Sequence, residues 1–213
     1  MSVLLEQLNQ KLQQQLAFIY RDIESHQPLP ELAEKLISLM RLDQQIHPVQ
    51  PHTNHWSEQD VILITYGDSV LAEGESPLVT LQHFLDDYVG DSINSVHILP
   101  FFPYSSDDGF AVIDYQAVNP SLGDWSDISD IAAKKRLMAD LVINHGSSES
   151  VWFQNFIIGE GEGHDFFFTA SPADDLSLVV RPRTSPLLRP TDTENDQQFV
   201  WCTFSHDQVD FDF

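Results

Sequence analysis

Cysteine is almost absent from this sequence, because Cys202 is the only one among its 213 residues. A lone cysteine can neither close an intrachain disulfide nor build a cysteine-based metal cluster. Its neighbours in VWCTF are mostly apolar, so we expect a small core residue there and not a nucleophile. The chemistry of this chain is therefore expected to depend on other side chains.

Basic residues are scarce as well: 10 Lys and Arg stand against 33 Asp and Glu, which gives a net charge of −23 at pH 7. Such a chain repels the phosphates of nucleic acid and of anionic membrane surfaces, so we expect neither as a partner. Acidity of this degree also fits a salty habitat or a neutral polar substrate. A well-solvated surface is the simplest explanation.

Long hydrophobic runs are missing too, since no run approaches the roughly 20 residues of a membrane-spanning helix. The N-terminus, MSVLLEQLNQKLQQQL, lacks the basic start and continuous apolar stretch of a signal peptide, so a cytoplasmic protein is expected. G-x-S-x-G, P-loop and H-E-x-x-H motifs are absent, and no cofactor is expected. What the chain does contain is 42% hydrophobic residues, enough for a packed core.

Two amphipathic helices are predicted near the N-terminus. The first follows apolar residues at spacings of three and four: Leu5, Leu8, Leu12, Leu16, Ile19 and Ile23. Pro28 and Pro30 end it, and the second is marked by Leu32, Leu36 and Leu39. Residues 1–55 are thus predicted to form a helical hairpin followed by the linker HPVQPHTNHW. Docking of the hairpin on the rest of the chain is favoured over binding to a partner helix.

Three short apolar runs then follow, namely VILITYGD from 61, SVHILPFF from 95 and RLMADLVINH from 136. Helices are predicted between them, in SPLVTLQHFLDDYV and GDWSDISDIAAKK. Continuous apolar runs are typical of strands buried on both faces of a parallel sheet. Residues 56–145 are therefore predicted to be α/β, with a third strand that ends at His145. From residue 146 the pattern is irregular and rich in turns, which indicates a functional lid or subdomain after the third strand.

Polar residues follow each of the three predicted strands. Asp68 follows the first, Asp107 and Asp108 the second, and Asn144 and His145 the third. Ligands of α/β sheets and barrels bind at the carboxyl ends of the strands, so one shared pocket is expected. A lone histidine is more often a satisfied core residue, but the coincidence at three strand ends favours a binding site.

Aromatic residues lie near these acids, and their rings suit the C–H faces of a sugar. Phe110 is one candidate, whereas Phe101 and Phe102 are expected to fill the core. Four blocks in order then make the family recognisable: SVHILPFFPYSSDDGFAVIDYQAVNPSLGDW, LMADLVINHGSSESVWFQNF, RPRTSPLL and VWCTFSHDQVDFD. From Trp56 to Phe213 the chain closely resembles the sucrose phosphorylase subfamily of the α-amylase superfamily.

This resemblance implies a (β/α)₈ TIM barrel with an irregular B domain inserted after the third strand, here residues 146–213. It also implies retaining transfer of glucose to phosphate through a carboxylate nucleophile. By the same resemblance, Asp107 and His145 would hold glucose hydroxyls and Phe110 would stack on the sugar. Phe204 and Gln208 would line the acceptor side, and Arg183 would face phosphate through its planar guanidinium. The N-terminal helices look like an extension of some members.

The chain departs from the family pattern at three points. Val180 replaces a tyrosine usual before RPR, which leaves the acceptor open. Asn144 stands where many amylases bind calcium, but this subfamily generally does without it, so no metal is expected. The sequence ends at Phe213, before the strands that would supply the nucleophile and the acid/base, so no catalytic residue is expected within it.

The chain is therefore interpreted as the N-terminal fragment of an α-glucoside phosphorylase, with α-glucoside and inorganic phosphate as small-molecule partners. Sucrose phosphorylase is the first choice. Glucosylglycerol or glucosylglycerate phosphorylase and a non-catalytic truncated product are the alternatives. The oligomeric state is left open, with a homodimer as one option.

Overall fold

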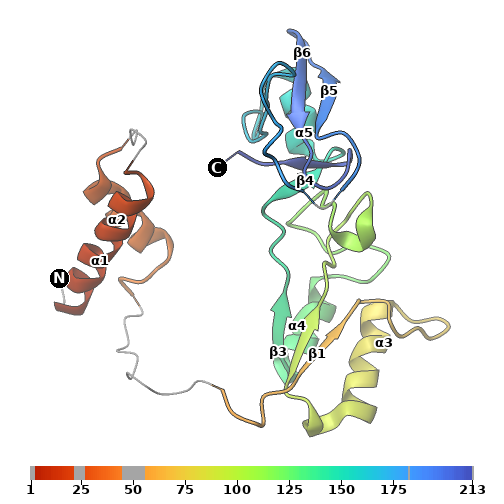
Figure 1. Ribbon diagram of the computed structural model, residues 1–213. Helices are drawn as coiled ribbons and strands as arrows, with labels where there is room; N and C mark the ends of the chain where they lie inside the picture. The colour runs from red at the N-terminus through yellow and green to blue at the C-terminus, as the bar shows by residue number, and fades with distance from the viewer. Residues whose placement is uncertain (1–2, 22–26, 45–55, 182, 213) are drawn as a thin grey trace. The chain divides into compact units, whose positions relative to one another are not determined.

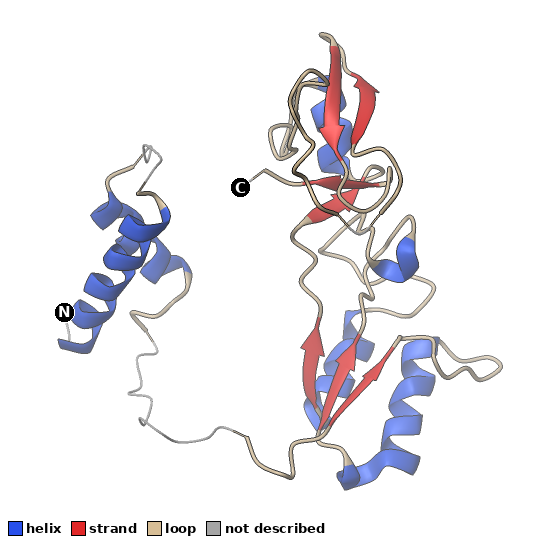
Figure 2. Ribbon diagram, viewed as in Figure 1, coloured by secondary structure: helices blue, strands red, loops and turns tan. Residues whose placement is uncertain are grey.

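The computed structural model describes residues 3–21, 27–44, 56–181 and 183–212 (Figures 1 and 2). It divides into two compact units, Met1–His55 and Trp56–Phe213. Most of the predicted linker and the predicted helical position Ile23 lie outside the described residues. No helix in the described ranges is long and apolar enough to cross a membrane.

The first unit contains the two predicted helices, α1 (Val3–Ile19) and α2 (Leu29–Leu39), which pack against each other. Pro28 precedes α2 and Pro30 lies in its first turn, where proline costs no helical hydrogen bond. The buried residues of this pair are Leu16, Ala33 and Ile37. These three side chains form a small core within the described residues of the two helices.

The second unit begins with a parallel sheet of three strands in the order β1-β2-β3. The strands are β1 (Ile62–Thr65), β2 (Ser95–Ile98) and β3 (Arg136–Ala139). Ile64 on β1 is in register with His97 on β2, which is in register with Met138 on β3. The predicted parallel α/β arrangement is therefore present.

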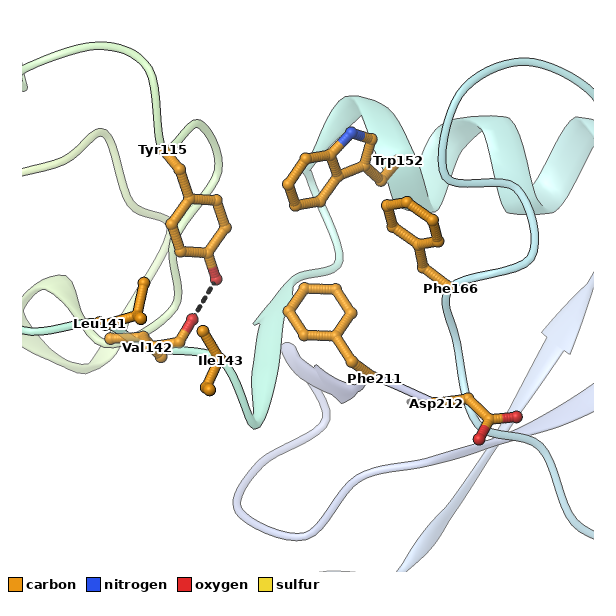
Figure 3. A pocket seen from close by; sticks show the side chains of 8 residues that line it. All are labelled: Tyr115, Leu141, Val142, Ile143, Trp152, Phe166, Phe211 and Asp212. Atoms are coloured by element: carbon orange, nitrogen blue, oxygen red, sulfur yellow. Dashed lines mark hydrogen bonds between the residues drawn. The ribbon is translucent and has the colours of Figure 1, made fainter. Parts of the chain in front are cut away.

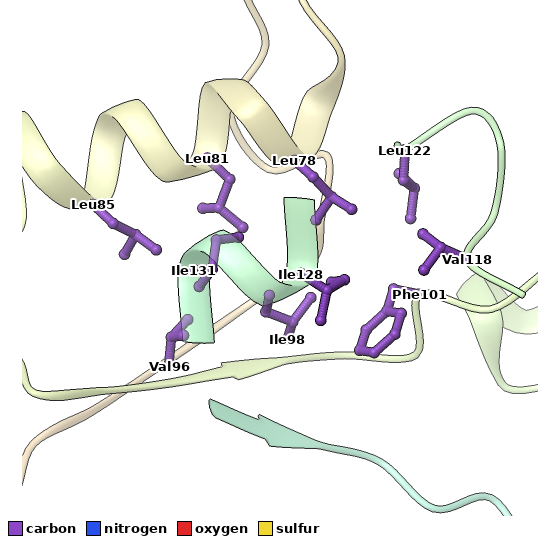
Figure 4. Packing of buried hydrophobic residues seen from close by; sticks show 10 residues of the cluster. All are labelled: Leu78, Leu81, Leu85, Val96, Ile98, Phe101, Val118, Leu122, Ile128 and Ile131. Atoms are coloured by element: carbon purple, nitrogen blue, oxygen red, sulfur yellow. The ribbon is translucent and has the colours of Figure 1, made fainter. Parts of the chain in front are cut away.

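Two helices cover one face of this sheet: α3 (Pro77–Phe84), which continues as a π-helical turn to Val89, and α4 (Trp125–Lys134). A capping box starts α4, because Asp124 accepts from the Ser126 amide and Asp127 accepts from the Asp124 amide. The core between helices and sheet includes Leu78, Leu81, Leu85, Val96, Ile98, Phe101, Val118, Leu122, Ile128 and Ile131 (Figure 4). Phe101 is thus a core residue, as predicted, and Phe102 packs against the same cluster.

The other face of the sheet is open within the described residues, so the expectation of burial on both faces is wrong for β1 and β3. Ile62 and Ile64 are 51% and 62% exposed, and Met138 is 42% exposed. Only the central strand β2 is largely buried. On this open face His97 Nε2 lies 2.8 Å from Asp140 Oδ2. We call the surface of Ile62, Ile64, His97, Met138 and Asp140 the open sheet face.

The third predicted strand is also shorter than expected. It ends at Ala139, and His145 belongs instead to β4 (His145–Ser147), which pairs antiparallel with β7 (Gln208–Asp210). The Tyr115 hydroxyl donates to the carbonyls of Val142 and His145, at 2.7 and 3.1 Å. Pairing with β2 stops at Ala139 and His145 pairs with Asp210 of β7, so the chain leaves the parallel sheet before His145.

The remaining elements form a second small body after β4. They are α5 (Val151–Ile158) and an antiparallel hairpin of β5 (Leu188–Asp192) and β6 (Gln197–Trp201). Their buried cluster consists of Phe153, Phe167, Val200, Cys202 and Val209. Cys202 is fully buried, as predicted, and burial raises the pKa of its thiol to about 12.

Candidate functional site

The structure brings the six predicted binding residues into one connected group. The Gln208 amide reaches Asp107, and its nitrogen lies 3.2 Å from His145 Nε2. The His145 ring lies 5.0 Å from the Phe204 ring, and the Arg183 guanidinium lies 5.8 Å from the Phe204 centroid. Phe110 joins through its carbonyl, 3.0 Å from His145 Nε2. The resemblance therefore selected residues that are spatial neighbours, although their roles remain predictions.

Asp107 lies in a tight turn after β2. Asp107, Asp108 and Gly109 have φ values of 58°, 51° and 106°, a region that residues other than glycine rarely adopt. A Cβ on Gly109 would lie 2.5 Å from the Pro100 carbonyl oxygen, so only glycine fits there. Strained backbone of this kind clusters at functional sites, where it aims side chains that a relaxed turn would point elsewhere.

His145 is 5% exposed and is held from both ring nitrogens. Nε2 faces the Phe110 carbonyl, and Nδ1 lies 3.3 Å from the Asn144 amide nitrogen. We assign the neutral tautomer with the proton on Nε2, because a carbonyl can only accept and an amide NH₂ can only donate. Burial lowers the pKa of His145, against the opposite influence of the Phe110 carbonyl and of Asp210 and Asp107. The ring is therefore a neutral donor near pH 7.

Gln208 is a buried residue that lies between Asp107 and His145. Its side chain is only 2% exposed, and Nε2 donates to Asp107 Oδ2 at 2.9 Å. In the tautomer assigned above His145 Nε2 carries a proton, so it offers no acceptor to this amide. The bond to the Asp107 carboxylate is thus what fixes Gln208, and it is of the stronger, charge-assisted kind.

The Phe204 side of the group is held by arginine. Arg181 Nη1 donates to the carbonyls of Cys202 and Thr203, at 2.7 and 3.4 Å, which anchors the segment that carries Phe204. Arg183 lies two residues further along the chain and is exposed over the Phe204 ring. A guanidinium in that place can bind a planar or tetrahedral anion. Val180 is 95% exposed.

Two cavities lie near the group. The first, of about 230 Å³, is lined by Tyr66, Gly67, Asp68, Pro100, Tyr104, Asp108 and Leu122. It joins the polar ends of β1 and β2, as predicted for Asp68 and Asp108. His145 does not line it, so the expectation of one pocket shared by all three strand ends is not met. The reason is the early end of β3, which moves His145 onto β4.

The second cavity, of about 460 Å³, was not anticipated from the sequence (Figure 3). It is lined by Tyr115, Leu141, Val142, Ile143, Trp152, Phe166, Phe211 and Asp212. The Tyr115 hydroxyl is engaged with the Val142 carbonyl, and burial raises its pKa to about 12. Almost all of the lining is apolar, so this cavity offers packing surface and little chemistry.

One polar residue beside the group was not predicted from the sequence. Asp207, beside Gln208, accepts hydrogen bonds from Ser105, Ser106 and Ser148. The two serine pairs at 105–106 and 147–148 were the available signal, but a serine pair alone predicts no partner. In the described part of the chain, no cluster of three or more His, Cys, Asp or Glu residues could hold a metal ion.

Comparisons with known proteins place this geometry in a family. The model of the α-amylase catalytic domain matches residues 86–213. Over 213 residues the chain is 44% identical to the glucosylglycerate phosphorylase of Allomeiothermus silvanus, covering 100% of this chain and 37% of the relative. It is 51% identical over 154 residues to the glucosylglycerate phosphorylase of Spirochaeta thermophila, covering 72% and 26%. It is 37% identical over 167 residues to the sucrose phosphorylase of Agrobacterium vitis, covering 73% and 34%.

A similar solved structure is the sucrose 6F-phosphate phosphorylase of Thermoanaerobacter thermosaccharolyticum. Its TM-score is 0.65 at 34% sequence identity, over 74% of this chain and 34% of that chain. The chain thus spans between about a quarter and two fifths of the length of these relatives.

Proposed function

The chain belongs to the α-amylase catalytic-domain family, and from this premise we propose that it is part of an α-glucoside phosphorylase whose preferred donor is glucosylglycerate. The choice of donor rests on the sequence identities to known phosphorylases. Glucosylglycerate phosphorylases match at 44% identity over all 213 residues and at 51% over 154, whereas a sucrose phosphorylase matches at 37% over 167. Sucrose, the first choice from the sequence, therefore becomes the second.

The proposed architecture is a (β/α)₈ barrel to which β1, β2 and β3 contribute. In such a barrel, helices cover the outer face of every strand and the opposite face lines the interior. The covered face and the open sheet face fit these two environments. Residues 146–213 would form the inserted B domain, with its own small core.

The glucose side of the site is assigned to Asp107, His145 and Phe110. The exposed Asp107 carboxylate accepts hydrogen bonds from hydroxyls, and Gln208 fixes its direction. His145, neutral and protonated on Nε2, can turn its donor from the Phe110 carbonyl to a sugar oxygen. A buried neutral donor costs less to desolvate than a charged one, so it suits a ligand without charge.

The acceptor side is assigned to Arg183, Phe204 and Gln208. Glycerate carries a carboxylate and inorganic phosphate is a mixture of the mono- and dianion near neutral pH, so both call for a cation in an otherwise acidic chain. Arg183 provides a planar guanidinium, which bonds two oxygens of either anion at once. The Phe204 ring provides a cation–π contact for this arginine, whose guanidinium carbon lies 5.8 Å from the ring centroid.

The proposed reaction has two displacements at the same carbon. The bond between glucose C1 and the glycerate oxygen breaks as that oxygen receives a proton, and C1 bonds to a carboxylate nucleophile. A phosphate oxygen then displaces that carboxylate and returns a proton to the enzyme acid/base, which gives glucose 1-phosphate with retained configuration. The residues of this chain bind and orient the two partners.

The test is a comparison of donors in the intact protein. Glucosylglycerate, glucosylglycerol and sucrose are supplied separately with phosphate, and the release of glucose 1-phosphate is measured. We expect kcat/KM for glucosylglycerate to exceed that for sucrose by at least about tenfold, because Arg183 can pair with the glycerate carboxylate and has no such partner in the neutral fructose leaving group. Equal or better use of sucrose would overturn the donor, and no glucose 1-phosphate from any of the three would overturn the function.

A further inference from the structure

We propose that Asp207 is a positioning residue, which holds the strained turn of residues 105–111 so that Asp107 faces the sugar. We call this segment the Asp107 turn. The catalytic consequence of the proposal rests on the proposed function, whereas the structural part does not. Asp207 itself does not reach the ligand in this assignment, and it acts through Asp107.

The contacts of Asp207 join both sides of the candidate site. Its Oδ2 accepts from the hydroxyls of Ser105 and Ser106 at 2.5 and 2.6 Å, on the chain that leads into the Asp107 turn. Its Oδ1 accepts from the Ser148 hydroxyl at 2.9 Å, and its carbonyl accepts from the Ser148 amide at 2.8 Å. Ser148 directly follows β4, the strand that starts at His145. One carboxylate therefore ties the Asp107 turn to the His145 strand.

The charge state of Asp207 suits this task. Burial acts to raise its pKa, but the hydroxyls of Ser105, Ser106 and Ser148 outweigh it together with the positive charge of Arg189, so the pKa is lowered. An ionised carboxylate accepts from all its hydroxyl partners without competing donors of its own. Arg189 is held nearby because its Nη1 donates to the His206 carbonyl at 2.7 Å.

The Asp107 turn needs such an external anchor. Its own backbone bonds are Ser105 N to Ala111 O at 3.1 Å, Phe110 N to Asp107 O at 3.0 Å, and Ala111 N to Ser106 O at 3.3 Å. Two non-glycine residues with positive φ oppose these bonds, because each prefers to relax to negative φ. The Ser105 and Ser106 hydroxyls fix the start of the turn to Asp207, the residue before β7, which opposes that relaxation.

The first experiment measures the turn without reference to activity. Hydrogen exchange of the Ser105, Phe110 and Ala111 amides is compared in the intact wild-type protein and in Asp207→Ala. We expect at least about tenfold faster exchange in the variant, because local opening controls these amides. The matched control is Asp175→Ala, which removes an exposed carboxylate that accepts from the Ser177 amide. Unchanged exchange in Asp207→Ala would overturn the proposal whatever the activity.

The second experiment measures the route to catalysis by a double-mutant cycle. Asp207→Ala should lower kcat/KM for the glucosyl donor by about tenfold to a hundredfold, since small misplacements of a binding group have effects of this size. In the Asp107→Ala background the same change should cost less than about threefold, because the residue that it positions is gone. Equal effects in both backgrounds would show that Asp207 does not act through Asp107.

Two further comparisons separate the outcomes. Asp207→Asn keeps one acceptor oxygen, so it should recover part of the exchange protection and activity, and it serves for the same comparison if Asp207→Ala does not fold. A wild-type protein that releases no glucose 1-phosphate, but whose exchange responds as expected, would refute the proposed function and leave the anchoring of the turn established.

Discussion

Replacing Gln208 by glutamate tests whether this residue and Asp107 form a buried, directional contact. The change is nearly isosteric, and it puts a second carboxyl group 2.9 Å from Asp107 Oδ2. Two ionised carboxylates at that distance repel each other by about 6 kcal/mol at an effective dielectric constant of about 20. Because position 208 is 2% exposed, loss of hydration adds to this penalty.

Protonation of the introduced carboxyl group costs less free energy than this repulsion. Binding a proton at pH 7 costs about 3.7 kcal/mol, since the ordinary glutamate pKa is about 4.3 and each pH unit corresponds to about 1.36 kcal/mol. The introduced carboxyl is therefore expected to be protonated in the folded protein, where it donates to Asp107 as the amide does. Its pKa is raised by folding, so the destabilisation is largest near pH 7 and above, and disappears as the pH falls toward about 4.3.

The assay is the melting temperature of the intact protein between pH 4.5 and 7.5. At pH 7 we expect Gln208→Glu to melt roughly 5–10 °C below wild type, with the gap closing on acidification. Gln197→Glu is the matched control, because Gln197 Nε2 donates to Asp192 Oδ1 at the same 2.9 Å and both residues are exposed. Solvent should limit that penalty to less than about 1 kcal/mol. A Gln208→Glu deficit that is absent, independent of pH or equal to that of the control would refute the reasoning.

Three other results are expected. Arg183→Ala should raise KM for phosphate at least about tenfold while slow hydrolysis of the donor persists, because it faces the acceptor; equal loss of both reactions, measured by release of glucose and glucose 1-phosphate, would contradict this. Gly109→Ala should lower the unfolding free energy by about 2 kcal/mol or more, because the new Cβ would be strained at positive φ and would contact Pro100. Gly74→Ala should cost clearly less, because Gly74 also has positive φ but no atom lies within 4 Å of an added Cβ; denaturant titration measures both. The polypeptide 1–213 alone should release no glucose 1-phosphate and should bind a hydrophobic dye through its open sheet face, whereas a sharply melting monomer would contradict the second expectation.

The elements with a strong local pattern could be predicted from the sequence. The parallel strands, the two helices between them and the N-terminal helices follow from apolar spacing and from proline and acidic residues at helix starts. The end of β3 could not be predicted this way, because Leu141, Val142 and Ile143 continue the apolar run. The strand ends where its pairing partner ends, because Ile98, the last residue of β2, is in register with Ala139, the last residue of β3.

The same limit applies to the candidate site. Asp107 and His145 were indicated by their places after predicted strands and Phe110 by its aromatic ring, whereas Arg183, Phe204 and Gln208 came from the resemblance alone. No local pattern would have joined Asp107 to Gln208 across 101 positions of the chain. Asp207 was missed for this reason: its serine partners lie 59 to 102 residues away, and nothing in their own segments indicates a common partner. Long-range polar contacts of this kind depend on the folded arrangement of loops, which apolar periodicity does not describe.

The lone thiol of this chain is a built-in reporter of local opening. Burial raises the pKa of Cys202 to about 12, which disfavours the reactive thiolate at pH 7, so we expect the folded protein to react slowly with alkylating agents and oxidants. Reaction requires exposure of the side chain, which is fully buried among Phe153, Phe167, Val200 and Val209. Because residues 1–213 contain no second cysteine, labelling within this part of the protein follows the opening of this one cluster, separately from the cluster beneath α3 and α4.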